Sequence, residues 1–134
     1  MHVVYLSLGS NLGDRHATMR RAIDMLNAEA GTVDRQSSLL ETEPWGFESA
    51  NKFLNMCVRL LTTLTPEQLL LKTQDIEKRL GRTVKSVDGK YHDRPIDIDM
   101  LMYDDVNIST PTLTLPHPHM HERNFVMIPL REIL

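Results

Sequence analysis

The amino-acid sequence predicts an α+β fold in which helices pack on an antiparallel sheet. Two amphipathic helical segments alternate with short β-rich runs, and together they give the element order β-α-β-β-α-β. This order is that of the ferredoxin-like fold, and extra elements follow it toward the C-terminus. A fold of this kind predicts no function by itself, so the function has to be sought in the loops and strand ends.

The first half of the sequence predicts three strands and one helix. A glycine-rich break follows the first strand, and Asp14 can then cap a helix for which Gly31 is a natural C-cap. A turn-rich loop with Pro44 and Gly46 separates the second strand from the third. The expected strands cover residues 3–8, 33–40 and 53–61.

The second half contains the best-marked helix. Thr65-Pro66-Glu67-Gln68 has the form of a capping box with proline at the first helical position, and Gly81 ends the helix. After a polar loop over residues 82–94, the expected elements are a strand over 96–103, a short hairpin partner over 106–108 and a helix from Asn124.

Composition limits the class of protein. The 134 residues fit a single domain over 1–134, with 41% hydrophobic and 25% charged residues. No apolar run is long enough to cross a membrane, the N-terminus lacks a basic leader, and the single Cys57 fits a small buried thiol better than a catalytic one. A cytoplasmic protein is expected. The net charge of −3 disfavours nucleic acid, so any polyanion that binds should be small.

The most informative segment is the strand that carries Asp97 and Asp99. Side chains alternate along a strand, so these two aspartates share one face, opposite Ile96, Ile98, Met100 and Met102. Paired carboxylates suit Mg²⁺, which typically takes one or two of them plus substrate phosphates. The alternative is a solvated strand face, which the low strand preference of aspartate weakens. Arg94, three residues earlier, adds a phosphate-binding group.

The polar loop before this strand is rich in basic residues. A mobile lid over a polyphosphate is one interpretation, and an ordinary solvated loop is the other. On the preceding helix Gln74 and Glu77 share a face, which could be a solvated stripe or a wall of a nucleotide site. The basic residues of the loop are Arg82, Lys85, Lys90 and Arg94.

Three histidines and an arginine gather near the C-terminus. His117, His119 and His121 alternate and could suggest zinc, but the segment has no cysteine and two prolines interrupt it. Contact with phosphate by a histidine beside Arg123 is favoured over zinc, and incidental surface histidines are the other interpretation.

A second small-molecule site is suggested by aromatic and amide side chains. Phe53 and Asn55 lie two apart on one strand face, where they could stack on a flat heterocycle and pair with its edge. Core packing remains the default for Phe53 and Phe125, whereas Trp45 in a Pro/Gly loop is harder to assign to a core.

Taken together, these segments resemble the hydroxymethyl-dihydropterin pyrophosphokinase family from Tyr5 to Leu130. Six motifs occur in the family's order and approximate spacing. They are Leu8-Gly9-Ser10-Asn11-Leu12-Gly13-Asp14, the loop with Thr42, Pro44 and Gly46, Phe53-Leu54-Asn55, Gln74-x-x-Glu77-x-x-x-Gly81-Arg82, Arg94-x-x-Asp97-x-Asp99, and Pro116-His117 followed by Arg123-x-Phe125.

The resemblance implies a reaction and a role for each matching residue. Pyrophosphate would pass from ATP to 6-hydroxymethyl-7,8-dihydropterin, with AMP as the second product. Two Mg²⁺ ions would bind Asp97 and Asp99, Arg82 and Arg94 would grip the β and γ phosphates, and Phe53 and Phe125 would sandwich the pterin. The nucleotide would contact Gln74, Glu77, Lys85, His117 and Arg123, and the pterin site would also include Thr42, Pro44, Trp45 and Asn55.

The sequence departs from the family pattern in the lid, where Tyr91 stands in place of the usual tryptophan. The resemblance also suggests a monomer. Two other functions stay open at this point: a magnesium-dependent nucleotidyltransferase or phosphohydrolase, and a non-enzymatic ferredoxin-like module that binds a small molecule.

Overall fold

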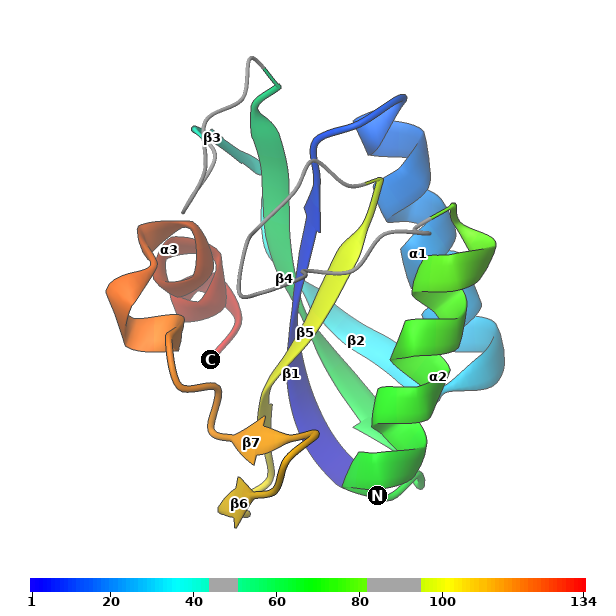
Figure 1. The fold of residues 1–134 in the computed structure, drawn as a ribbon, viewed down its shortest axis with the longest axis vertical. Helices are drawn as coiled ribbons and strands as arrows, with labels where there is room; N and C mark the ends of the chain where they lie inside the picture. Colours follow the sequence, from blue (N-terminus) through cyan, green and yellow to red (C-terminus); the bar gives the residue numbers. More distant parts are fainter. Residues whose placement is uncertain (44–50, 82–94) are drawn as a thin grey trace.

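A computed structural model of the chain describes residues 1–43, 51–81 and 95–134. A main sheet is sandwiched between helices, and a small two-stranded sheet lies at one end (Figure 1). The elements are β1 His2–Ser10, α1 Arg15–Glu29, β2 Thr32–Gln36, β3 Leu40–Thr42, β4 Phe53–Thr62, α2 Pro66–Arg79, β5 Asp97–Tyr103, β6 Ile108–Ser109, β7 Thr114–Leu115, η1 Met120–Glu122 and α3 Asn124–Ile133.

The main sheet has the strand order β2-β4-β1-β5, with β3 alongside β4, and its pairings are antiparallel. The central strands β1 and β4 are thus flanked by β2 and β5, as the two interleaved β-α-β units of the ferredoxin-like fold require. Helices α1 and α2 lie on one face of this sheet, and α3 lies on the other (Figure 1). The predicted fold class is confirmed.

Side-chain alternation along the strands divides the core between these two faces. Cys57 and Leu101 point toward α3, where they pack with Val126 and Leu130. The residues that point the other way, toward α1 and α2, include Val4, Leu6, Leu8, Met56, Val58 and Leu60. Because the first face is only partly covered by α3, it is the face on which polar strand residues stay accessible.

A β-bulge changes this alternation inside β5. The pairing of β5 with β1 shifts in register between Tyr5 and Leu6, so Leu101 and Met102 both pack on the α3 side. The sequence predicted that Met102 would share a face with Ile98 and Met100, and this is wrong, because the extra residue of a bulge inverts the alternation beyond it. Asp97 and Asp99 precede the bulge and keep the predicted phase.

The predicted helix ends are largely confirmed. The Asp14 carboxylate accepts the N–H of Ala17 at 3.1 Å, and Thr65 and Gln68 form the reciprocal capping box. Helix α1 ends at Glu29 and its C-cap is Ala30, one residue before the predicted cap. Glycine is needed at position 31 because a Cβ there would lie 2.0 Å from the carbonyl oxygen of Leu61. Gly31 is therefore needed because the chain passes very close to the backbone of β4.

Two predicted strands differ from those observed. The single strand expected over 33–40 is divided into β2 and β3, because Ser38 leaves the ladder and donates from its N–H and hydroxyl to Glu132 of α3. The hairpin partner expected for β5 pairs with β7 instead, through Ile108 opposite Leu115.

Cys57 is fully buried under α3. Its Sγ lies 3.6 Å from the carbonyl oxygen of Val126, and burial raises the pKa of the thiol to about 12. The thiol therefore stays protonated at neutral pH, which agrees with the predicted structural role. None of the described helices combines the length and the apolar character that crossing a membrane demands.

Candidate active site

The two aspartates of β5 lie side by side on the α3 face of the sheet. Asp97 pairs with Gly9 of β1 and Asp99 pairs with Ser7, while the intervening Ile98 is buried on the opposite face. Both aspartates are partly exposed, so the predicted shared face is confirmed and their carboxylates are accessible. Two anionic oxygen donors with room for further ligands match what Mg²⁺ takes from a protein when phosphates complete its coordination.

Arg123 lies between the aspartates and the start of α3. Its side chain is only 7% exposed, and its Nη1 is 3.9 Å from Oδ2 of Asp99. The guanidinium carbon also lies 5.6 Å from the ring centroid of Phe125. Arg123 thus brings a buried positive charge to the aspartate end of the face and contacts an aromatic ring on α3.

His117 reaches the same region by a backbone contact with β5. Its N–H donates to the carbonyl oxygen of Leu101 at 2.9 Å. Burial, followed by the nearby charges of Arg123 and His119, lowers the pKa of His117 to about 4. Its Nδ1 accepts the N–H of His119 at 3.1 Å, so the neutral ring carries its proton on Nε2. The imidazole can therefore donate one hydrogen bond to a phosphate oxygen.

The other two histidines of the segment are exposed. His119 pairs with Glu122 at 3.1 Å, and within residues 1–43, 51–81 and 95–134 no three His, Cys, Asp or Glu side chains converge as a metal site. In the described part of the chain, a bound divalent ion would therefore depend on phosphate or water oxygens as well as on the aspartates.

Across β1 from Asp97, the same face carries a buried amide beside an aromatic ring, because Gly9 pairs with Asp97 on one side and with Asn55 on the other. The Asn55 side-chain nitrogen donates to the carbonyl oxygen of Leu40 at 3.2 Å and to the hydroxyl of Thr42 at 2.8 Å. These contacts leave Asn55 Oδ1 over Gly9, where a Cβ would lie 3.4 Å from that oxygen and 3.5 Å from the Phe53 ring. Glycine at position 9 therefore opens a space bordered by an acceptor and an aromatic edge.

These features can be set beside known proteins. The family model of 7,8-dihydro-6-hydroxymethylpterin-pyrophosphokinase (HPPK) matches residues 5–134. The chain belongs to the HPPK family. A Porphyromonas gingivalis protein named 2-amino-4-hydroxy-6-hydroxymethyldihydropteridine pyrophosphokinase is 52% identical over 99% of this chain and 91% of its own length. The Bacillus subtilis protein of the same name is 44% identical over 98% of this chain and 78% of its own.

Solved structures agree on the fold. A crystal structure of HPPK-DHPS in complex with substrates has a TM-score of 0.77 at 14% identity, and wild-type Plasmodium falciparum HPPK-DHPS with SDX-DHP has a TM-score of 0.75 at 13% identity. They cover 98% and 95% of this chain, which spans only 40% of either of those chains. The family predicted from the six motifs is confirmed by the family model and the curated relatives.

Several predicted site residues lie outside the described residues. These are Pro44, Trp45, Arg82, Lys85 and Arg94, and with them the whole predicted lid. Their assigned roles stay predictions. On α2, Gln74 is half-buried one turn before Glu77, and its predicted contact with the nucleotide also stays a prediction.

Glu77 makes a contact that its spacing did not predict. Its side chain is largely buried, and its Oε2 accepts the N–H of Ile98 at 2.8 Å. Helical periodicity places Glu77 on a face of α2 but cannot say which strand lies opposite. A buried acidic residue among the apolar positions of a helix was the available signal, because such a carboxylate requires a partner.

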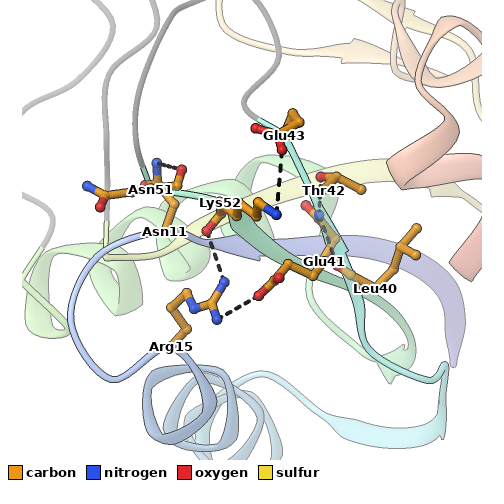
Figure 2. A network of polar contacts seen from close by, with 9 residues as sticks. Asn11, Arg15, Leu40, Glu41, Thr42, Glu43, Asn51 and Lys52 are labelled. Atoms are coloured by element: carbon orange, nitrogen blue, oxygen red, sulfur yellow. Dashed lines mark hydrogen bonds and ion pairs between the residues drawn. The ribbon is translucent and has the colours of Figure 1, made fainter.

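Arg15 is a residue that the sequence analysis did not single out. Figure 2 shows it reaching from the start of α1 to both β3 and the residue before β4. Its Nη2 lies 2.8 Å from Oε2 of Glu41, and its Nη1 donates to the carbonyl oxygen of Lys52 at 3.0 Å. Asn11 adds a contact from its side-chain nitrogen to the Asn51 carbonyl oxygen at 3.3 Å. This network ties together the strands that carry Thr42 and Phe53.

Proposed function

We propose that the protein transfers the terminal pyrophosphate of ATP to the hydroxymethyl group of 6-hydroxymethyl-7,8-dihydropterin in folate biosynthesis. The products are AMP and (7,8-dihydropterin-6-yl)methyl diphosphate. Membership of the HPPK family supports the reaction class, and relatives that share 42–52% of their residues with this chain carry the corresponding enzyme name. The observation that carries the proposal is one sheet face on which the paired aspartates and the Asn55–Phe53 pair lie on either side of Gly9 in β1.

In this reaction the pterin hydroxyl oxygen forms a bond to the β-phosphorus of ATP. The bond from that phosphorus to the oxygen shared with the α-phosphate breaks, AMP leaves with the electron pair, and the proton of the pterin hydroxyl is released to solvent. Asp97 and Asp99 would hold two Mg²⁺ ions, whose charge would offset that of the phosphates. His117 donates from Nε2 to a phosphate oxygen, and Arg123 brings a fixed positive charge. Catalysis then consists of positioning and electrostatic stabilisation.

Each substrate has a proposed set of contacts. Asn55 Oδ1 accepts a hydrogen bond from the pterin edge, an orientation supported by the contacts of its nitrogen with Leu40 and Thr42. Arg82 and Arg94 grip the β and γ phosphates, and Phe53 and Phe125 stack on the pterin. The remaining assignments are Gln74, Glu77 and Lys85 to the nucleotide, and Pro44 and Trp45 to the pterin. A monomeric state and a cytoplasmic location stay predictions.

The proposal is tested by incubating the protein with ATP, Mg²⁺ and the pterin and measuring AMP by chromatography. AMP formation that requires both pterin and metal, with one diphosphorylated pterin per AMP, is the expected result. A nucleotidyltransferase would instead release pyrophosphate, and a phosphohydrolase would consume ATP without pterin. A folded protein that binds ligands without turnover would support a binding module and overturn the proposal.

A further inference from the structure

The strand that carries the two aspartates is the outermost strand of the described main sheet. Strand β5 pairs with β1 on one side, and the N–H of Ile98 points away from β1 toward α2. A backbone N–H at a sheet edge has no strand to receive it, so its orientation depends on another partner. Glu77 supplies that partner from α2, with its Oε2 2.8 Å from the Ile98 nitrogen.

This contact is strong for a single hydrogen bond. The Glu77 side chain is buried in a helix whose other buried residues are Leu69, Thr73 and Ile76. Losing a hydrogen bond in such surroundings leaves a buried N–H and a buried carboxyl oxygen unsatisfied, which costs more than the loss of a bond that water can replace. The sheet edge at Ile98 is thereby fixed to α2.

The Ile98 nitrogen belongs to the peptide group that joins Asp97 to Ile98. A peptide group is planar and holds its two Cα atoms about 3.8 Å apart, so fixing its orientation also fixes the backbone of Asp97. Asp99 follows on the other side of Ile98. The carboxylate on α2 therefore acts on both aspartates from the opposite layer of the sheet, without lying on their face.

We propose that Glu77 is a positioning residue, whose hydrogen bond to Ile98 holds Asp97 and Asp99 in the arrangement that the magnesium–triphosphate needs. This inference rests on the proposed function, because it takes the two aspartates as metal ligands. It replaces the direct contact with the nucleotide that was assigned to Glu77 above on the basis of the family resemblance.

The two roles separate when nucleotide binding is measured with and without metal. The probe is α,β-methylene ATP, in which the bond that the reaction breaks is replaced by a stable one. Its Kd is measured by NMR titration at saturating Mg²⁺ and again in EDTA, and the ratio of the Kd in EDTA to the Kd at saturating Mg²⁺ reports the metal-dependent part of binding. A direct contact with the nucleotide would weaken binding in both conditions, whereas a positioning role would reduce only the ratio.

The variants are Glu77→Leu, Glu77→Gln and the control Glu67→Leu. Leucine removes the acceptor but suits the apolar face of α2, and glutamine keeps an acceptor oxygen. Glu67 is exposed on the same helix, about 15 Å away along its axis. Circular dichroism and the NMR spectrum verify folding, and amide exchange of Ile98 in the metal-free protein reports the hydrogen bond itself.

In Glu77→Leu the ratio and kcat should fall by about tenfold, as is typical when a partner of a metal ligand is lost. The Kd in EDTA and the KM for pterin should stay within about twofold, and Ile98 should exchange about tenfold faster. Glu77→Gln should recover most of the loss, and Glu67→Leu should resemble the wild type. An unchanged ratio in Glu77→Leu, or an equal loss in EDTA, would overturn the positioning role. A wild-type protein that forms no AMP would instead overturn the proposed function.

Discussion

The two ends of the candidate site are held in place by different kinds of contact. At the aspartate end, β5 is fixed to α2 through Glu77, whose side chain is buried. At the pterin end, β3 and the start of β4 are joined by Arg15, whose ion pair with Glu41 has side chains that are 25% and 47% exposed. A buried hydrogen bond costs more to break than an exposed ion pair, because its loss leaves buried polar groups unsatisfied, whereas solvent and salt screen the exposed pair.

This difference suggests a division of tasks along one sheet face. Metal coordination and phosphate transfer tolerate little movement of their ligands, and we propose them for the end at which the backbone is fixed from within. The proposed pterin end has one buried polar side chain, Asn55, and its strands β3 and β4 are joined to each other by contacts of Arg15 at the surface. Substitutions at the aspartate end should therefore have the larger effects, and those at the surface ties the smaller ones.

The largest effect is expected for Asp97→Ala. Removing one of the two carboxylates takes away charge stabilisation from the transition state, so turnover should fall by more than about tenfold. The measurement is AMP formation at saturating ATP, Mg²⁺ and pterin. Asp105→Ala is the control, because Asp105 is an exposed acidic residue just after β5. Normal folding with unchanged turnover in Asp97→Ala would refute the metal-site assignment.

A somewhat smaller and more selective effect is expected for Asn55→Ala. The substitution removes the acceptor oxygen over Gly9 and also the donor to Leu40 and Thr42, so pterin affinity should fall by about tenfold. The Kd for α,β-methylene ATP should stay within about twofold. Calorimetry on both ligands measures this, with Asn107→Ala as an exposed control. A parallel loss of nucleotide affinity would show that the two ends are not independent.

Sequence reasoning reached those parts of the site that strand alternation and local capping determine. The shared face of Asp97 and Asp99, the pairing of Phe53 with Asn55, and the caps at Asp14 and Thr65 follow from neighbours within a few residues. These features repeat with a period of two or lie within one helical turn, so no knowledge of the tertiary fold is needed.

The remainder depends on which segments meet in space. The bulge in β5 that turns Met102 toward α3 arises from the register with β1, and composition carries no sign of it. The partner of Glu77 is 21 residues away, and His117 is placed by a bond to Leu101. Periodicity gives the face on which each of these residues lies, but the opposite strand is set by the packing of the whole sheet.

His117 gives a pH-dependent test of burial at the aspartate end. Its pKa is about 4 in the folded protein and near the ordinary value of about 6.5 when unfolded, with Arg123 and His119 opposing the charge and Asp97 favouring it. The unfolded chain therefore binds the proton first as pH falls. The stabilisation is complete above about pH 6.5 and is lost as pH falls toward 4.

Comparison of wild type with His117→Gln isolates this contribution. Urea unfolding of the metal-free proteins at pH 7 and pH 4.5 should show a smaller pH-dependent loss in the variant, by about 1–2 kcal/mol after allowance for partial solvent screening. His121→Gln, at an exposed position of the same segment, is the control. Equal losses in wild type and His117→Gln would mean that His117 titrates as it does in the unfolded chain.

The smallest effect is expected for Arg15→Ala, which removes the surface tie between β3 and the residue before β4. Exposed ion pairs contribute up to about 1 kcal/mol, so the Kd for pterin should rise by about two- to fivefold while nucleotide affinity stays unchanged. Arg20→Ala, an exposed arginine on the same helix, serves as the control, and both proteins are measured by calorimetry at low and high salt. Because salt screens the Arg15–Glu41 pair, the difference from wild type should narrow at high salt. Arg15→Ala could instead weaken pterin binding more than Asn55→Ala does. In that case β3 and β4 depend on their surface contacts as strongly as β5 depends on Glu77, and the contrast between the two ends is wrong.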